Sequence, residues 1–215
     1  TVGGSGKSPF TQLVVERLTH LGRAPVILLR GYGGSACGPQ IVRASDSAKT
    51  VGAEALMHLL HFGDKVPVVV ARRRIEGARI VVAEKLGDAI VLDDGFQHRG
   101  LARDLDLLLV DLSDESKRTA WERGALLPAG PLRESREGAL KRASAVVFLI
   151  RGKKQLENFE QSHSLLSLAG DLPIFRVVMT PIDFVDLVSG EKRELSSMKG
   201  TIGSAVAAIA FPEPF

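Results

Sequence analysis

The first eight residues combine glycines, a lysine and a serine in an order typical of phosphate binding. They read Thr1-Val2-Gly3-Gly4-Ser5-Gly6-Lys7-Ser8. Backbone N–H groups can point at phosphate oxygens only where no Cβ blocks the approach, which explains the glycines. In such a loop the lysine contacts the β- and γ-phosphates of a nucleotide, and the serine hydroxyl binds Mg²⁺. The sequence therefore predicts a nucleotide-phosphate site made of Gly3, Gly4, Ser5, Gly6, Lys7 and Ser8.

The residues around this loop bear on the prediction. Thr1 stands where the usual G-x-x-x-x-G-K-[ST] pattern begins with glycine, so a glycine-rich turn with a chance lysine is the alternative. Residues 8–21 carry apolar side chains at helical spacing, and Pro9 suits a first helical turn. A helix there adds the positive end of its dipole to an anion site. The strand that normally precedes such a loop is not in the sequence, so we expect either that the sequence is an excerpt of a longer protein or that its first strand is missing.

A second stretch ends an apolar run in two carboxylates. Residues 89–92 are Ala-Ile-Val-Leu, and Asp93 and Asp94 follow. A buried strand that delivers an aspartate to the sheet edge is how nucleotide hydrolases and kinases hold Mg²⁺. Neighbouring side chains on a strand face opposite ways, so we expect one aspartate to face Mg²⁺ and the other the loop towards Gln97 and His98. Gly95 is expected to supply the turn between them; an acidic turn that caps a strand is the alternative.

A glycine-rich loop carries the only tyrosine of the chain. Residues 30–34 read Arg-Gly-Tyr-Gly-Gly and follow an apolar run at 25–29. Ligands in open α/β sheets bind at the carboxyl ends of strands. Arg30 and Tyr32 are therefore candidates to hold a phosphorylated sugar, and a surface turn with a solvated arginine explains the spacing equally well.

Two further groups of polar residues are interpreted as ordinary. The arginines at 72, 73 and 74 are expected mainly to form a solvated face, with phosphate or lipid headgroups as the alternative. His58 and His61 stand three apart on a predicted helix, a spacing compatible with metal binding. No third ligand follows nearby, so surface or core histidines are favoured.

Strand-like and helix-like segments alternate along the chain, which predicts an α/β fold with a doubly wound, mainly parallel sheet. Residues 39–50 look polar and irregular, and a polar insert carries Trp121. Helices are expected at 8–21, 54–60, 72–86 and between 150 and 174, and strands at 25–29, 66–70, 89–92, 107–110, 145–150 and 174–179.

The pattern changes after Pro181, where two alternating segments around Ser189-Gly190 predict a hairpin. An apolar run at 205–210 predicts one more strand close to the end of the sequence. We expect a phosphate-binding domain over 1–180, a two-stranded linker over 181–197, and the start of a truncated second α/β domain over 198–215.

Composition adds weak limits. The chain is 45% hydrophobic and 25% charged, as in ordinary soluble domains. One cysteine, Cys37, excludes an internal disulfide and favours a reducing compartment. A net charge of +3 and a pI near 9.2 suit an anionic substrate or membrane surface without requiring either. No run approaches the ~18 apolar residues of a spanning helix.

Five motifs in order resemble the tetraacyldisaccharide 4'-kinase family of lipid A synthesis. They are Gly-Gly-Ser-Gly-Lys-Ser-Pro at 3–9, Arg-Gly-Tyr-Gly-Gly at 30–34, Asp-Asp-Gly-Phe-Gln-His-Arg at 93–99, Leu-Ala-Arg-Asp-Leu-Asp at 101–106 and Leu-Pro-Ala-Gly-Pro-Leu-Arg-Glu at 127–134. The resemblance implies two α/β domains joined by a two-stranded linker. It also implies transfer of the ATP γ-phosphate, with Mg²⁺, to the 4'-hydroxyl of an acylated glucosamine disaccharide 1-phosphate.

The same resemblance implies a place and a set of site residues. Such enzymes are peripheral or singly anchored on the cytoplasmic face of the Gram-negative inner membrane, and no nucleic acid is involved. The implied residues are Lys7, Asp94 and His98 for catalysis, the loop residues with Gln97 for ATP, Arg30, Tyr32 and Glu54 for the acceptor, and Ser8, Asp93 and Glu134 for the metal.

Three departures from the family pattern leave other functions open. The family has Gly-Asp-Glu where this chain reads Gly52-Ala53-Glu54, and its aspartate resembles a catalytic base. Its Gly-Asn-Gly is replaced here by Glu122-Arg123-Gly124, and its catalytic histidine belongs to a later domain. A catalytically impaired nucleotide-binding module or scaffold is therefore one alternative. A P-loop GTPase is another, although no Asn-Lys-x-Asp guanine signature is present.

Overall fold

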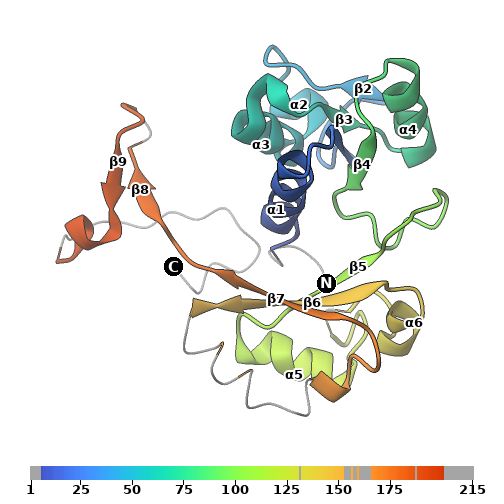
Figure 1. Ribbon diagram of the computed structural model, residues 1–215, viewed down its shortest axis with the longest axis vertical. Coiled ribbons are helices and arrows are strands. Elements are labelled where there is room, and N and C mark those ends of the chain that lie inside the picture. The colour runs from blue at the N-terminus through green and yellow to red at the C-terminus, as the bar shows by residue number, and fades with distance from the viewer. Residues whose placement is uncertain are drawn as a thin grey trace. The chain divides into compact units, whose positions relative to one another are not determined.

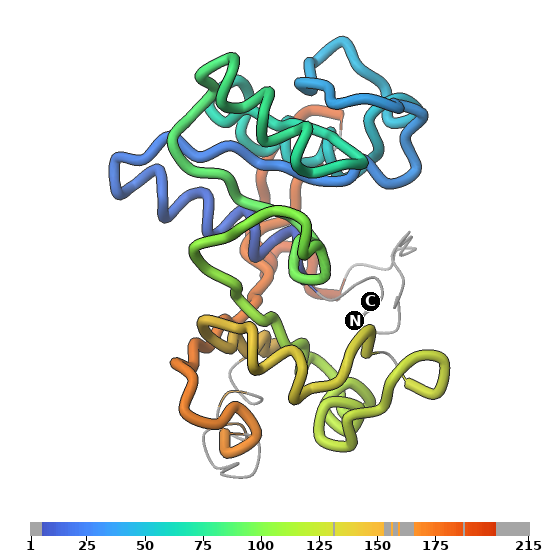
Figure 2. Tube along the Cα trace, turned by 90° about the vertical axis from the view of Figure 1, so that its right-hand side faces the viewer, coloured from blue at the N-terminus to red at the C-terminus, as the bar shows by residue number. Residues whose placement is uncertain are grey.

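The computed structural model describes residues 6–130, 132–152, 156, 159, 166–186 and 188–200. The chain divides into two compact units, one of residues Gly6–Leu105 and one that contains the described residues from Asp106 onward. Figure 1 shows the elements of each unit as ribbons, and Figure 2 traces the chain as a tube. Each unit is an α/β structure with a parallel sheet, which confirms the predicted fold class.

The first unit contains a four-stranded sheet in the order β2-β3-β1-β4. Strands β1, β3 and β4 are parallel, with Ile27 opposite both Val68 and Val91, and the short β2 pairs antiparallel with β3. A 3₁₀ turn spans Gly63–Lys65. The elements are α1 (Lys7–His20), β1 (Pro25–Leu29), β2 (Gln40–Ile41), α2 (Ala48–Val51), α3 (Ala53–Phe62), β3 (Val68–Val70), α4 (Arg74–Ala83) and β4 (Ala89–Leu92).

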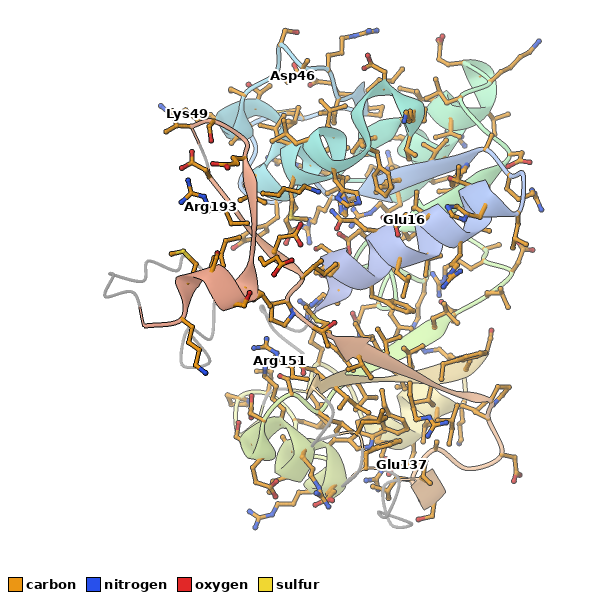
Figure 3. All side chains as sticks on the ribbon, turned by 60° about the vertical axis from the view of Figure 1, so that its left-hand side comes forward. Glu16, Asp46, Lys49, Glu137, Arg151 and Arg193 are labelled. Atoms are coloured by element: carbon orange, nitrogen blue, oxygen red, sulfur yellow. The ribbon has the colours of Figure 1, made fainter. Side chains whose placement is uncertain are left out.

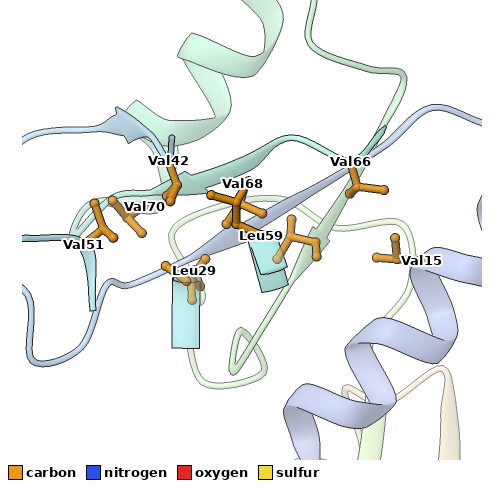
Figure 4. Packing of buried hydrophobic residues seen from close by; sticks show 10 residues of the cluster. Val15, Leu29, Val42, Val51, Leu59, Val66, Val68 and Val70 are labelled. Carbon is orange, nitrogen blue, oxygen red and sulfur yellow. The ribbon is translucent and has the colours of Figure 1, made fainter. Parts of the chain in front are cut away.

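Helices cover both faces of this sheet because alternate strand residues point to opposite sides. Ile27 of β1 packs in a buried cluster with Val15 of α1 and Leu59 of α3 (Figure 4). Its neighbour Leu28 packs on the other face in a cluster with Val81 of α4. Two apolar layers explain why β1 reads as an unbroken apolar run, as a doubly wound sheet requires.

The second unit contains a parallel sheet in the order β5-β6-β7 and a separate antiparallel hairpin. Phe148 of β6 and Trp121 of α5 belong to its main buried cluster. A 3₁₀ turn spans Leu195–Met198. The elements are β5 (Leu107–Asp111), α5 (Glu115–Arg123), α6 (Arg136–Leu140), β6 (Ala145–Arg151), β7 (Ile174–Met179), β8 (Asp183–Val185) and β9 (Lys192–Glu194).

The strands predicted between residues 25 and 179 agree with the structure, but two other predictions do not. Residues 39–50 are not irregular throughout, since they contain β2 and α2. The polar insert around Trp121, for which no element was predicted, is the helix α5, and Trp121 is buried in the cluster that contains Phe148 of the sheet. The predicted helix 72–86 is shorter, from Arg74 to Ala83. The predicted strand at 205–210 lies outside the described residues. Nowhere in the described ranges is a helix both long and apolar enough to cross a bilayer.

Asp114 caps α5 and also pairs with a buried lysine. Its Oδ1 accepts a hydrogen bond from the Lys117 backbone N–H at 2.9 Å, and its Oδ2 lies 3.1 Å from Lys117 Nζ. Lys117 is 8% exposed and lies 2.9 Å from Asp111 at the end of β5. Burial raises the pKa of Asp114, but hydrogen bonds from Ser116 and Lys117 outweigh burial and hold the pKa below its ordinary value of 3.8.

We predict that Asp114→Ala lowers the free energy of unfolding by about 0.5–2 kcal/mol, because the first turn of α5 loses its cap. The matched variant Asp114→Asn keeps a capping oxygen and should stay closer to the wild type. Folding lowers the pKa of Asp114. The difference in the free energy of unfolding between the wild type and the alanine variant should therefore be largest above pH 3.8 and decrease as the pH falls below 3.8. Chemical denaturation across pH measures both effects, and equal stability of alanine variant and wild type at neutral pH would contradict the capping role.

Candidate functional site

Asp93 lies at the carboxyl end of β4 and is buried, with 3% of the residue exposed. Its Oδ1 accepts a hydrogen bond from Thr11 Oγ1 of α1 at 3.2 Å, and its Oδ2 lies 2.8 Å from His58 Nε2 of α3. Its backbone N–H bonds to the Leu28 carbonyl of β1 at 3.2 Å. Through its side chain and its backbone, Asp93 therefore joins two helices and two strands of the first unit.

The hydrogen bonds keep this buried carboxylate ionised. Burial alone would raise the pKa of Asp93, since it removes the charge from water. The hydrogen bond and electrostatic attraction from His58, with hydrogen bonds from Ser8 and Thr11, outweigh burial and hold the pKa below 3.8. At neutral pH the site thus contains a negative charge next to the first turn of α1.

The chain turns at Asp94 itself, where φ is +52°. The expectation that Gly95 supplies this turn is wrong. Gly95 matters for packing instead, because a Cβ there would lie 2.4 Å from the Leu92 Cβ. Aspartate tolerates the left-handed conformation better than most residues do, which explains how the turn forms without glycine. Asp93 is buried and Asp94 is exposed, and which of them would face Mg²⁺ stays a prediction.

Lys7 and Asp94 lie together at the start of α1. The distance from Lys7 Nζ to Asp94 Oδ1 is 3.7 Å, and both side chains are partly exposed. Gly6 precedes the helix with φ +69°, a conformation that glycine adopts without strain. The positive end of the helix, a lysine and two aspartates thus meet at one edge of the sheet. Gly3, Gly4 and Ser5 of the predicted loop lie outside the described residues.

The start of α3 belongs to the same region. Ala53 is the first residue of α3, and Glu54 is the second. Partial burial raises the pKa of Glu54, and the charges of Asp93 and Asp94 raise it further, whereas Lys7 and His58 act in the opposite direction. Glu54 therefore interacts electrostatically with Asp93 and Asp94 at the end of β4. It belongs to the same region as these two predicted site residues.

The loop with Arg30 and Tyr32 packs against the residues that lead into α3. The Ser35 backbone N–H bonds to the carbonyl of Lys49, labelled in Figure 3, at 2.9 Å. A Cβ at Gly34 would lie only 2.5 Å from the Thr50 carbonyl oxygen and 2.8 Å from the Gly52 nitrogen. Tyr32 is 81% exposed. This close backbone approach fixes the loop beside the first turn of α3.

The three consecutive arginines do not form one solvated face. Arg72 and Arg73 are exposed, but Arg74 is 5% exposed and donates to the Ala71 carbonyl at 2.9 Å. Burial lowers the pKa of Arg74, and the positive charge of Arg30 lowers it further. Burial and then the charges of Arg74 and Arg103 also lower the pKa of His98. These groups form a basic cluster at the carboxyl ends of the strands.

The remaining predicted residues are placed less decisively. Gln97 is exposed in the turn after Asp94. Glu134 lies in the second unit, where both of its carboxylate oxygens bond to Arg142 Nη2 at 2.7 and 2.6 Å. Across the described residues, no three histidine, cysteine, aspartate or glutamate side chains form a ready-made metal cluster.

Comparisons with known proteins identify the family of this chain. The profile of the family described as tetraacyldisaccharide-1-P 4'-kinase matches residues 1–215. The chain belongs to this family. The 4'-kinase of Syntrophus aciditrophicus is 37% identical over all of this chain and 59% of its own length, and that of Anaeromyxobacter dehalogenans is 38% identical over 97% and 54%. The crystal structure of Aquifex aeolicus LpxK in complex with ATP superposes with a TM-score of 0.68 at 29% identity, covering 93% of this chain and 58% of that one.

The chain thus spans little more than half the length of these 4'-kinase relatives. Sequence reasoning missed three side chains that the structure brings to the site of this family member: Thr11, His58 and Arg74. Thr11 and His58 look like ordinary helix residues, and only their contacts with Asp93 distinguish them. The position of Arg74 could have been predicted from the sequence, because it begins a helix shortly after a strand ends.

We predict that Gly34→Ala lowers the free energy of unfolding by about 1–3 kcal/mol. The new Cβ would overlap backbone atoms, which, unlike the end of a side chain, cannot rotate out of the way. Gly38→Ala is the matched control in the same loop, because a Cβ added there would meet no atom within 4 Å and the φ of Gly38 is not positive. Thermal and chemical unfolding of both variants measure the difference. Equal stability of the two variants would show that the close approach at Gly34 does not hold the loop.

Proposed function

We propose that this chain is the ATP-binding part of a tetraacyldisaccharide 4'-kinase, which transfers the γ-phosphoryl group to the 4'-hydroxyl of an acylated glucosamine disaccharide 1-phosphate. One observation carries the proposal: Lys7, at the amino end of α1, lies 3.7 Å from Asp94, next to the buried Asp93. A lysine and a helix amino terminus attract phosphate, and an ionised aspartate beside them attracts a divalent cation. Family membership supports the acceptor.

The residues present fit ATP and Mg²⁺. Gly6 adopts a left-handed conformation directly before the helix, as a chain that wraps around a phosphate requires. The metal would be held by hard oxygen donors, the Ser8 hydroxyl and the Asp93 carboxylate. Such ligands are those that Mg²⁺ prefers. When bound, Mg²⁺ neutralises charge on the phosphate oxygens.

The basic cluster supports an anionic acceptor. Arg30 and Arg74 carry positive charge at the carboxyl ends of the strands. Burial lowers the pKa of Arg74 and the charge of Arg30 lowers it further, and burial and then the charges of Arg74 and Arg103 lower the pKa of His98. An acceptor phosphate placed there would relieve the repulsion among these groups. Arg30 and Tyr32 would contact the acceptor, with Glu54 near its hydroxyl, while Lys7 and Asp94 act at the transferred phosphate and Gln97 contacts the nucleotide.

The reaction replaces one P–O bond by another. The 4'-oxygen bonds to the γ-phosphorus, the bond to the β–γ bridging oxygen breaks, ADP leaves, and the hydroxyl proton passes to a base. Ala53 cannot accept that proton. This residue favours a second candidate function, a nucleotide-binding module with impaired transfer. The GTPase alternative has no such support. An acylated acceptor favours action at a membrane surface, and the family resemblance implies the cytoplasmic face of the inner membrane.

Lys7→Ala should weaken ATP binding by about 10- to 100-fold, because it removes a charge-assisted hydrogen bond to phosphate. His98→Ala should weaken it less, since His98 belongs to the acceptor side. Titration of the full chain with a fluorescent ATP analogue in Mg²⁺ measures both affinities. Equal losses in the two variants would contradict the placement of the phosphates at Lys7, and tighter binding of GTP than of ATP would revive the GTPase alternative.

Ala53→Asp should raise the rate of phosphoryl transfer by about 10²–10⁴-fold, because it restores a proton acceptor at the start of α3. The measurement is transfer of ³²P from ATP to the disaccharide 1-phosphate by the full-length gene product. Ala53→Asn is the matched control, since it has the same shape and accepts no proton at neutral pH. A folded Ala53→Asp variant that binds ATP and transfers nothing would contradict the kinase assignment.

A further inference from the structure

We propose that His58 is a positioning residue for the nucleotide and metal site, because its imidazole fixes the orientation of the Asp93 carboxylate. The proposal rests on the proposed function, since it assigns Asp93 to a site that binds ATP with Mg²⁺. His58 does not contact the reacting groups in this role. It acts through Asp93.

The geometry gives each oxygen of Asp93 its own donor. An ionised carboxylate only accepts hydrogen bonds, so His58 Nε2–H is the donor to Oδ2 at 2.8 Å, and Thr11 Oγ1–H is the donor to Oδ1 at 3.2 Å. The terminal torsion of an aspartate is otherwise broad. Hydrogen bonds from donors on two different helices restrict this torsion in Asp93. They therefore fix the direction in which the remaining lone pairs of the carboxylate point.

The choice of a histidine is not explained by packing. His58 is fully buried, and its helix neighbours Ala55 and Leu59 belong to an apolar cluster. Its Nδ1 has no hydrogen-bond partner among the described residues, a condition that typically costs about 1–3 kcal/mol. A leucine would fill similar space without that cost. Among the described residues, Asp93 is the only hydrogen-bond partner of the imidazole, so this bond accounts for a polar residue here.

His58 also links the two sides of the site. It lies on α3, whose first turn carries Ala53 and Glu54, while Asp93 ends β4 and Thr11 lies on α1. A change in the His58–Asp93 bond would therefore move the carboxylate relative to the first turn of α1. Hydrogen-bonded partners of metal ligands commonly change metal affinity by about 10–100-fold when they are removed.

The test uses two amides at position 58 in the full chain. His58→Gln places its side-chain nitrogen near the position of Nε2 and can still donate to Asp93. His58→Asn is also a buried amide, but its nitrogen lies near the position of Nδ1 and cannot reach Oδ2. His61→Asn is the control on the same helix, because His61 is partly exposed and bonds to Glu16 of α1, labelled in Figure 3, at 3.0 Å.

For each variant the affinity for a fluorescent ATP analogue is titrated in Mg²⁺ and again in EDTA, and the Mg²⁺ concentration for half-maximal enhancement is recorded. We expect His58→Asn to raise that concentration by about 10-fold or more, with affinity in EDTA changed less than about 3-fold. His58→Gln should restore the Mg²⁺ requirement to within about 3-fold of the wild type, and His61→Asn should not change it.

Three results would overturn the proposal. Equal Mg²⁺ requirements in His58→Gln and His58→Asn would show that the bond to Asp93 does not position the carboxylate. Equal losses in Mg²⁺ and EDTA would show a structural role only. A wild-type chain that binds no nucleotide would refute the proposed function and the positioning role with it, whereas the first two results leave the proposed function standing.

If His58→Asn does not fold, as judged by circular dichroism, Thr11→Val decides the question. Valine has the shape of threonine and removes the donor to Oδ1. A loss confined to Mg²⁺-dependent binding would support the fixed carboxylate, and unchanged Mg²⁺ dependence would contradict it.

Discussion

A charged carboxylate buried at the end of a strand is the constraint on which the first unit depends. Taking the charge of Asp93 out of water is costly unless donors replace the lost hydration. Thr11 and His58 supply those donors from two different helices, and the main chain of Asp93 bonds to β1. Helices α1 and α3 must therefore converge on the tip of β4, and this places Lys7 beside Asp94. The apolar clusters on the two faces of the sheet hold those helices in place.

The site has two chemically different sides that share this carboxylate. On one side lie the helix amino terminus, Lys7 and Asp94, the groups to which the proposed function assigns phosphate and cation. On the other side Arg30 and Arg74 carry positive charge next to His98, and burial followed by the charge of neighbouring arginines lowers the pKa values of Arg74 and His98. The start of α3 belongs to the same region, through Glu54 and its electrostatic coupling to both aspartates. Ala53 leaves that region without the carboxylate that the family resemblance would place there.

Much of this arrangement follows from local pattern. Glycines before a lysine and an apolar run ending in aspartate predicted the phosphate-binding helix start and the acidic strand end, because both depend on a few neighbouring residues. Contacts between distant segments were not predictable in the same way. The bond between His58 and Asp93 joins residues 35 positions apart, and nothing in the spacing of His58 distinguishes it from a core histidine. The helix around Trp121 was missed because its sequence is mostly polar and its buried face is narrow. The turn at Asp94 was assigned to Gly95 because glycine is the usual residue with positive φ, whereas Gly95 is required by its contact with Leu92.

The most direct test of the central claim is a crystal structure of the chain with Mg²⁺ and a non-hydrolysable ATP analogue. The account predicts a triphosphate at the amino end of α1, with Lys7 Nζ and backbone N–H groups of the first turn within hydrogen-bond distance of its oxygens and the metal next to Ser8. A triphosphate bound elsewhere on the chain, with Lys7 still paired to Asp94, would contradict it.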